Sequence, residues 1–297
     1  MSRIVRVAAV QLTSGTDVTR NVDAAVDLVL AAAGEGATYV QLPEYFNYLG
    51  PQSKYAAVAE SIPGPTTQRF GEVARSCAAT IHLGSMLERS TVSGKCYNTS
   101  VVLDASGAIV ATYRKAHLFD IDVPGAVVQR ESDAIVAGDQ LVVTEVAGLN
   151  LGLSVCFDLR FPELYRQLAV HGATVLAIPA AFNALTGQAH WDVLIRSRAI
   201  ENHAFVVAAA QVGTTAEGVA TYGHSMIVGP WGDVLAESTA GGNDVVLATL
   251  ELDDVVRRRQ QIDVLGLRRP DVYDSLNDAD TARSIVSTSS AAPREPH

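Results

Sequence analysis

The sequence predicts an α/β fold arranged as a four-layer αββα sandwich, in which two internally related halves pack sheet against sheet. Two observations support this prediction. Strand-like and helix-like segments alternate along most of the 297 residues, which is typical of sheets covered by helices. In addition, residues 100–111 align with residues 225–236 without a gap, as a weak internal repeat.

The first half begins with a strand rich in Val and Ala. A helix follows, because apolar residues recur on one face with helical spacing and Gly34 and Gly36 mark its end. The predicted elements in chain order are a strand at 4–12, a helix at 18–33, a strand at 38–43, a helix at 66–77 and a strand at 80–87.

The second half repeats the alternation of strands and helices. Its predicted elements are a strand at 151–155, a helix at 162–171, a strand at 174–179, a helix at 191–203 and a strand at 205–211.

The repeat itself predicts a β-hairpin in each half. Each copy reads as a strand, a four-residue turn that ends at Gly107 or Gly232, and a second strand. Both copies come after a helix and a strand, which is why we expect two related halves. Because such hairpins are common, chance similarity is the alternative explanation.

No linker divides the chain, so residues 1–273 are expected to form a single domain. Residues 274–297 are rich in Asp, Ser, Thr and Ala and contain few residues that could form a core. We expect this tail to be extended over a neighbouring surface or disordered.

Composition excludes several functional classes. The net charge of −10 argues against a nucleic-acid surface, and no apolar run is long enough to cross a bilayer. The three cysteines lack disulfide or metal spacing and the N-terminus lacks a signal-peptide pattern, so a cytoplasmic location is expected. Neither a glycine-rich phosphate loop nor a metal-ligand cluster is evident, and we expect no metal and no cofactor.

Cys156 is the most informative residue. It follows the apolar run 149–155 and opens a turn that leads into a predicted helix. Unpaired N–H groups at a helix start favour a thiolate and a developing oxyanion, which suits a nucleophile. The alternative is an ordinary buried cysteine in the core.

Three further residues suit the chemistry of a nucleophilic thiol. Glu44 follows a predicted strand, Lys115 is one of only three lysines among 22 basic residues, and Glu131 lies in an irregular segment. If the carboxyl ends of neighbouring strands converge, these side chains meet Cys156 in one pocket. Taken singly, each could be a solvated surface charge.

Together the four residues predict acyl transfer. Glu44 would take the thiol proton as general base, and Cys156 would attack a carbonyl carbon. Lys115 would stabilise the oxyanion beside the backbone N–H of Phe157, and Glu131 would hold Lys115 in place.

The surrounding strings resemble the nitrilase superfamily of carbon–nitrogen hydrolases, from about Arg6 to Tyr273. The resemblance implies the αββα fold, a Glu–Lys–Cys catalytic set and a second, structural Glu. It is nearest to the amidase branch that contains deaminated glutathione amidase and omega-amidase. The matching strings are Leu-Pro-Glu44, Tyr-Arg-Lys115-Ala-His-Leu-Phe-Asp-Ile-Asp-Val-Pro-Gly125, Glu131-Ser, Gly-Leu-Ser-Val-Cys156-Phe-Asp-Leu-Arg-Phe-Pro-Glu-Leu164, Ala-His-Trp191, Tyr-Gly-His-Ser225 and Arg-Arg-Pro-Asp271.

The implied function is a thiol-dependent amidase that cleaves a small carboxylate-bearing amide through a thioester and releases ammonia. Deaminated glutathione and the ω-amide of a 2-oxo acid are the expected substrates. A nitrilase, an N-carbamoyl amidohydrolase or an acyl-transfer enzyme of the same fold is the alternative, and a non-catalytic binding protein is a further one. Resemblance to this superfamily also implies a homodimer or a higher homo-oligomer.

Residues near the motifs are expected to bind the substrate. Arg160 and Arg196 are candidates for a bidentate clamp on the substrate carboxylate, with helix-surface arginines as the alternative. Gln188 stands where both relatives usually have Pro, which changes loop stiffness near the expected pocket. The predicted substrate-binding residues are Phe157, Arg160, Phe182, Asn183, His190 and Trp191.

Overall fold

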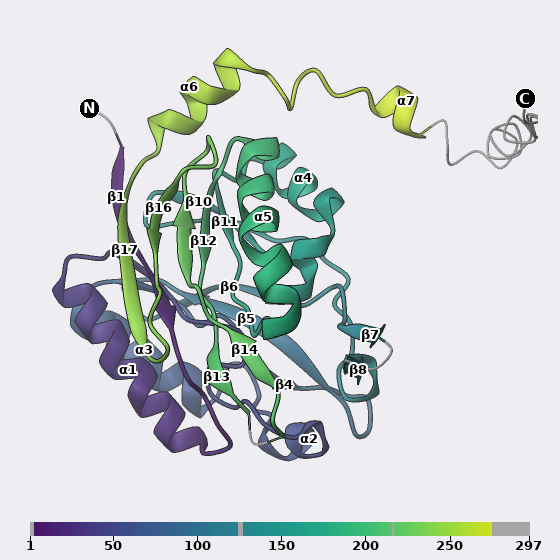
Figure 1. The fold of residues 1–297 in the computed structure, drawn as a ribbon. Helices are drawn as coiled ribbons and strands as arrows, with labels where there is room; N and C mark the ends of the chain where they lie inside the picture. The colour runs from purple at the N-terminus through teal and green to yellow at the C-terminus, as the bar shows by residue number, and fades with distance from the viewer. Residues whose placement is uncertain (1–2, 124–126, 216, 275–297) are drawn as a thin grey trace, which may run out of the picture.

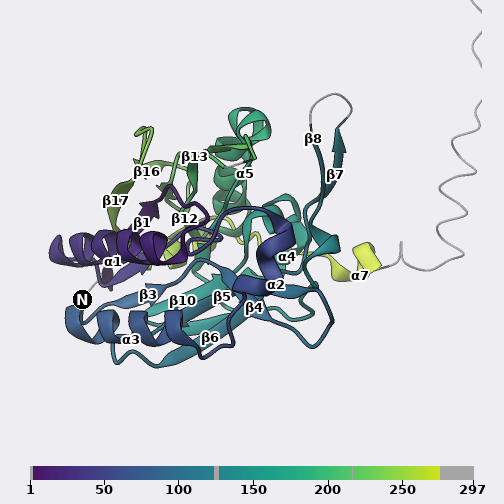
Figure 2. The same ribbon diagram turned by 90° about the horizontal axis from the view of Figure 1, so that it is seen from below.

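Two mixed β-sheets pack face to face at the centre of the molecule, with helices on both outer sides (Figures 1 and 2). This computed structural model describes residues 3–123, 127–215 and 217–274. Helices α1 (Val18–Gly34) and α3 (Pro65–Cys77) cover one sheet. Helices α4 (Pro162–Val170) and α5 (Ala184–Asn202) cover the other. The predicted four-layer αββα sandwich is therefore confirmed.

The first sheet has the strand order β17-β1-β2-β3-β5, with β4 and β6 also paired to β5. The second sheet has the order β16-β15-β12-β11-β10-β9. The strands of the first sheet are β1 (Ile4–Gln11), β2 (Tyr39–Gln41), β3 (Thr80–His82), β4 (Met86–Arg89), β5 (Cys96–Leu103), β6 (Ile109–Arg114) and β17 (Asp244–Glu251). Those of the second are β9 (Val143–Val146), β10 (Leu149–Leu153), β11 (Val175–Ala177), β12 (Phe205–Ala208), β15 (Met226–Val228) and β16 (Val234–Glu237).

The two sheets have the same plan, which confirms the prediction of related halves. Each contains three parallel strands in order, β1-β2-β3 or β10-β11-β12, with an antiparallel strand beside the first of them. Beside the third lies an antiparallel hairpin, β5–β6 or β15–β16. These are the two hairpins of the sequence repeat, and Gly107 and Gly232 have φ values of 78° and 87° in their turns.

Strand β1 illustrates why both faces of the sheets are apolar. Side chains alternate along a strand, so Val7 and Ala9 face the core between the sheets. Ala8 and Val10 face α1 and α3 instead. Strands buried on both faces read as continuous apolar runs, and this is the pattern that the sequence shows there.

Two predicted elements differ most from the structure, while the strands predicted at 38–43, 174–179 and 205–211 are each three residues shorter. The strand predicted at 80–87 is split into β3 and β4, because the register with β5 advances by one residue at Gly84, where φ is 58°. Helix α5 begins at Ala184 rather than at residue 191. Its first turns contain Thr and Gly, which are poor helix formers, but the Asn183 side chain caps them by accepting a hydrogen bond from the Leu185 N–H.

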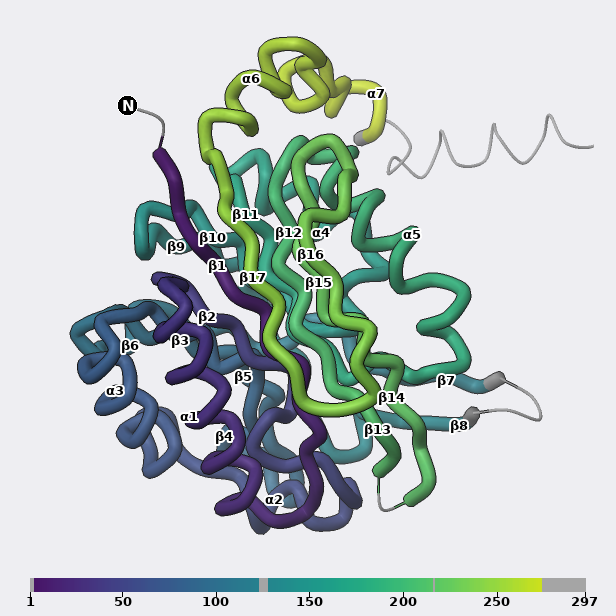
Figure 3. Tube along the Cα trace, turned by 60° about the vertical axis from the view of Figure 1, so that its left-hand side comes forward, coloured from purple at the N-terminus to yellow at the C-terminus, as the bar shows by residue number. Residues whose placement is uncertain are grey.

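Smaller elements complete the described chain. Helices α6 and α7 run along one end of the sandwich (Figure 3), and of the predicted tail 274–297 only residue 274 lies within the described residues. No helix in the described ranges has the length and apolar character to span a membrane. These elements are the hairpins β7 (Asp120–Val123) with β8 (Val127–Arg130) and β13 (Val212–Thr214) with β14 (Ala220–Tyr222), helices α2 (Tyr55–Val58), α6 (Asp253–Gln261) and α7 (Pro270–Asp274), and 3₁₀ helices η1 (Gln52–Lys54), η2 (Glu131–Asp133) and η3 (Cys156–Arg160).

Candidate active site

The four predicted catalytic residues meet at one edge of the sandwich, just beyond the ends of strands. Glu44 follows β2, Lys115 follows β6 and Cys156 follows β10, while Glu131 opens η2 after β8. One detail of the expectation is corrected, because these strands are not neighbours in a sheet. Strands β2 and β6 are separated by β3 and β5, and β10 belongs to the second sheet. The residues converge because the two sheets face each other.

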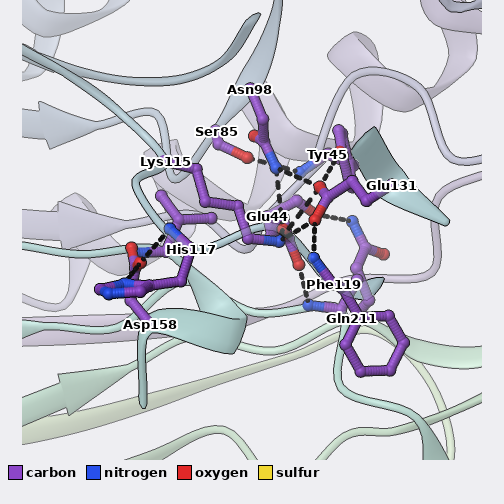
Figure 4. A network of polar contacts seen from close by, with 12 residues as sticks. Glu44, Tyr45, Ser85, Asn98, Lys115, His117, Phe119, Glu131, Asp158 and Gln211 are labelled. Carbon is purple, nitrogen blue, oxygen red and sulfur yellow. Dashed lines mark hydrogen bonds and ion pairs between the residues drawn. The ribbon is translucent and has the colours of Figure 1, made fainter. Parts of the chain in front are cut away.

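The Lys115 ammonium lies between two carboxylates (Figure 4). Its Nζ is 3.0 Å from Oε1 of Glu44 and 2.8 Å from Oε2 of Glu131. All three side chains are at most 3% exposed. Burial alone would lower the pKa of Lys115, but the charges of Glu131 and Glu44 raise it well above its ordinary value. Lys115 therefore stays a cation in the buried site.

The groups around the Glu131 carboxylate donate hydrogen bonds to both of its oxygens. Its Oε1 accepts from the Tyr45 hydroxyl at 2.7 Å and from Asn98 Nδ2 at 3.4 Å, and its Oε2 accepts from the Phe119 N–H at 2.6 Å. Burial alone would raise the pKa of Glu131, but the Lys115 charge and these hydrogen bonds lower it. Glu131 is therefore a fixed anion.

Glu44 is held in place on both oxygens. Its Oε1 accepts from Asn98 Nδ2 at 2.9 Å as well as from the lysine, and its Oε2 accepts from the Ala181 N–H at 2.8 Å. Its backbone carbonyl accepts from Gln211 Nε2 at 3.0 Å. The carboxylate also lies near the Cys156 thiol, and its negative charge raises the pKa of that thiol.

The Cys156 backbone has a left-handed conformation, with a φ of 49°, where the chain leaves β10 and enters η3. Burial raises the pKa of its thiol well above the ordinary value, and the Glu44 charge raises it further. Lys115 and the Ala181 N–H act in the opposite direction but are the smaller influences. At the helix start we expect a thiolate to be favoured, but burial and the Glu44 charge outweigh the N–H groups there and favour the protonated thiol.

Asp158 joins the cysteine turn to the segment that carries Lys115. Its Oδ2 accepts from the Val155 N–H and the Tyr113 hydroxyl, each at 2.8 Å. Its Oδ1 accepts from the His117 N–H at 3.0 Å and from Nδ1 of the same residue at 2.7 Å. Because Asp158 is fully buried, these bonds fix the spacing between the thiol and the ammonium.

The four residues lie on the wall of a cavity of about 480 Å³. Three of the predicted substrate-binding residues, Phe157, Phe182 and Asn183, also line it. The rest of the wall comes from the segment around α2 and from the hairpins β7–β8 and β13–β14. In the described part of the chain, no three His, Cys, Asp or Glu side chains are grouped so that they could hold a metal ion.

The other predicted substrate-binding residues lie outside the cavity wall. The Arg160 guanidinium lies over the rings of Phe157 and Phe182 and contacts His190 Nδ1 at 3.3 Å. Trp191 is buried behind Phe182, with ring centroids 5.2 Å apart, and its indole N–H donates a hydrogen bond to the backbone carbonyl of His224. These three residues do not line the cavity, because proximity in sequence does not set which way a side chain points, and their contact with the substrate stays a prediction.

Arg196, the second candidate for a carboxylate clamp, faces away from the cavity. Its Nε donates to the Gly232 carbonyl at 2.8 Å, and its Nη1 lies 3.5 Å from Asp192 Oδ2. Gln188 lies in the second turn of α5, so the helix forms without the Pro that both relatives usually have at this position. Neither residue lines the cavity.

Sequence reasoning missed several groups that hold the site together. Asn98 lies inside β5 and donates to both Glu44 and Glu131. Its only signal in the sequence is an amide side chain near the start of a strand, and the structure shows that this amide is fully buried. The N–H groups of Phe119 and Ala181 gave no signal, because backbone donors are present at nearly every residue.

Comparison with known proteins defines the class. The model of the family "Carbon-nitrogen hydrolase" matches residues 6–260, so the chain belongs to this family, as the resemblance to the nitrilase superfamily predicted. Among individual proteins, the chain is similar to deaminated glutathione amidase of Homo sapiens, with 41% identity over 276 residues, 91% of this chain and 84% of the relative. It is also similar to omega-amidase NIT2 of Homo sapiens, with 39% identity over 269 residues, 90% of this chain and 96% of the relative.

Solved structures agree with the family assignment. The C. elegans NitFhit protein has 35% identity and a TM-score of 0.86, covering 92% of this chain and 66% of its own. An amidase variant from Nesterenkonia sp. AN1 has 25% identity and a TM-score of 0.77, covering 91% of this chain and 96% of its own. That structure carries the acetamide moiety of fluoroacetamide, added covalently at its active site cysteine.

Proposed function

We propose that this protein is an amidase that hydrolyses a small amide bearing a carboxylate, through a thioester on Cys156. The observation that carries the proposal is that Cys156, Glu44 and the buried ammonium of Lys115 meet on the wall of one cavity. The ω-amide of a 2-oxo acid and deaminated glutathione are the proposed substrates. The names of the human relatives support this choice.

In the acylation half, Glu44 takes the thiol proton as sulfur attacks the amide carbon. Because the pKa of the thiol is raised, the proton leaves during the attack and no free thiolate is stored. The carbonyl oxygen becomes an oxyanion that the Lys115 ammonium stabilises. Glu44 then gives the proton to the amide nitrogen, the C–N bond breaks, and ammonia or an amine leaves the thioester.

In the deacylation half, Glu44 acts a second time as a base. It takes a proton from water, and the resulting hydroxide attacks the thioester carbon. The C–S bond breaks, the carboxylic acid leaves, and the proton on Glu44 returns to the sulfur. Glu131 touches none of the reacting atoms; it is a positioning residue that keeps Lys115 charged and in place.

A Cys156→Ala variant tests this mechanism. Wild-type protein should release ammonia from 2-oxo acid ω-amides, and acid quenching during turnover should trap an acyl group on Cys156, detectable by mass spectrometry. The variant should show neither. Cys77→Ala is the matched control, because Cys77 is a half-buried thiol on α3. Ammonia release that survives in Cys156→Ala would contradict the mechanism.

The same assay includes the alternatives within the fold. Nitriles, N-carbamoyl compounds and acyl acceptors belong in the substrate panel. Turnover of a nitrile, release of carbon dioxide, or acyl transfer without ammonia would replace the amidase by that activity. No turnover of any compound in the panel, together with no acyl group on Cys156, would favour a binding protein instead.

We further propose a single domain over residues 1–273, a homodimer or higher homo-oligomer, and a cytoplasmic location. Three free cysteines support a reducing compartment. Exposed apolar residues along α5, Leu185, Val193 and Ile200, support association, since such surfaces favour protein contacts. Light scattering coupled to gel filtration would measure the assembly, and a monomer at micromolar concentration would contradict it.

A further inference from the structure

The distance between Glu44 and Cys156 depends on contacts between the two sheets. Glu44 follows β2 of the first sheet, whereas Cys156 follows β10 of the second. The proposed mechanism requires the carboxylate and the thiol to lie within reach of one proton. Residues 179–181, which follow β11, and Gln211, which follows β12, make contacts that connect the two groups.

The segment 179–181 contacts the nucleophile at one end and the base at the other. The carbonyl of its first residue accepts a hydrogen bond from the Cys156 N–H at 2.8 Å. The N–H of its third residue donates to Oε2 of Glu44 at 2.8 Å. Between them, the carbonyl of the second residue accepts from the Gln211 N–H at 2.8 Å. The Gln211 backbone is therefore fixed to the segment that binds both reacting groups.

The side chain of Gln211 reaches across to the segments that belong to the first sheet, beside Glu44 (Figure 4). Its Nε2 donates to the backbone carbonyl of Glu44 at 3.0 Å and to Oγ of Ser14 at 2.9 Å. Its Oε1 accepts from the Ser14 N–H at 3.0 Å. The Ser14 hydroxyl in turn donates to the Phe46 carbonyl at 2.8 Å. One buried amide and one buried hydroxyl thus hold two carbonyls of the loop that carries the base.

The loop that carries Glu44 needs this support because of its backbone conformation. Tyr45, the next residue, has a φ of 55°, in the left-handed region that a residue with a side chain adopts only at a cost. Such a conformation persists where the surrounding structure fixes it. Ser85 Oγ accepts from the Tyr45 N–H at 3.1 Å, and Gln211 holds the Glu44 carbonyl on the preceding peptide group. Without the Gln211 amide, the loop would relax and the carboxylate would shift relative to the thiol.

We propose that Gln211 is a positioning residue that holds the general base Glu44 at reacting distance from the Cys156 thiol. This inference rests on the amidase function proposed above. Gln211 is fully buried and does not line the cavity, so it acts through Glu44 rather than on the substrate. Because Glu44 moves a proton in both halves of the reaction, its displacement should lower kcat and leave KM nearly unchanged.

The experiment measures kcat and KM for 2-oxoglutaramate, a 2-oxo acid ω-amide. Gln211→Met keeps the length of the side chain but removes its hydrogen bonds, so kcat should fall about tenfold to a hundredfold while KM changes less than about threefold. Ser14→Ala leaves the bond from Gln211 to Glu44 in place and should lower kcat about threefold to tenfold.

Gln11→Met is the matched control. Gln11 is also fully buried, and its side chain makes three hydrogen bonds with described residues, none of them in the Glu44 loop. The control should lose thermal stability to a similar extent as Gln211→Met, whereas its kcat should stay within about twofold of wild type.

The other outcomes contradict the inference in distinguishable ways. An unchanged kcat in Gln211→Met, or a rise in KM alone, would overturn the positioning role and keep the amidase. An equal loss of kcat in Gln11→Met would mean general destabilisation instead. If Gln211→Met does not fold, an unchanged kcat in Ser14→Ala would overturn the inference. Wild-type protein that hydrolyses no amide would overturn the proposed function itself.

Discussion

The stability of the fold should fall steeply in mild acid because of one buried histidine. His82 lies in β3, is fully buried, and contacts the Tyr39 hydroxyl through Nδ1 at 3.0 Å and the Ser100 hydroxyl through Nε2. Tyr39 donates its own proton to Gln41, so Nδ1 of His82 donates and Nε2 accepts, as in a neutral ring. Burial lowers the pKa of His82 to about 3.

The sign of the effect follows from proton uptake. An unfolded histidine binds a proton below about pH 6.5, whereas folded His82 stays neutral until about pH 3. The unfolded state is therefore favoured as the pH falls from 6.5 to 3. Between pH 7 and pH 5 this single group should lower the free energy of unfolding by about 2 kcal/mol. The magnitude depends only on the unfolded pKa, provided that the folded value stays below about 4.

Urea unfolding at pH 7 and pH 5, for wild type and for His82→Gln, isolates this contribution. The variant will be less stable at both pH values, but the other titrating groups are the same in both proteins. The difference between the two pH-induced changes should therefore be about 2 kcal/mol. Equal pH-induced changes in the two proteins would refute the assignment of a neutral, buried His82.

Three substitutions should affect the site. Glu131→Gln should lower the free energy of unfolding by about 3–5 kcal/mol in a urea titration. Donors face both oxygens of Glu131, so the amide nitrogen of the new side chain would face a donor in either orientation of the amide. A loss under about 1 kcal/mol would contradict this prediction. Asn98→Asp adds a third carboxylate beside Glu44, so kcat/KM should fall about 100-fold, and an unchanged value would refute the role of the amide. Gly84→Ala would press a Cβ into the loop before Glu44 and should cost about 2 kcal/mol or more, whereas Gly94→Ala, in open space, should cost about 1 kcal/mol; equal losses would exclude the clash.

The position of the candidate catalytic residues could be predicted from the sequence because each lies within three residues after the end of a strand. Strand ends collect at sheet edges, so Glu44, Lys115 and Cys156 could be expected in one place before any contact was known. The hairpin repeat likewise predicted two related halves. It could be recognised because each of its turns needs a glycine with positive φ at the same position.

Other parts of the site could not be predicted, because they depend on packing between segments far apart in the chain. Asn98 reaches both carboxylates only once β5 lies beside β4 and β6. The raised pKa of the Cys156 thiol comes from burial, which is set by the whole sandwich. The motif around Trp191 predicts a substrate contact, but helical periodicity places this side chain in the core.

The last strand of the first sheet comes from the far end of the chain. Strand β17 pairs with β1 along its whole length, from Ile4 opposite Glu251 to Gln11 opposite Asp244 (Figure 3). During synthesis, β1 leaves the ribosome early, but its partner emerges only after the second sheet is complete. The backbone N–H and C=O groups on the outer edge of β1 therefore stay unpaired until nearly the entire chain has been synthesised. A nascent first half is an unfinished sheet, and the two halves reach their final form together even though they share one plan.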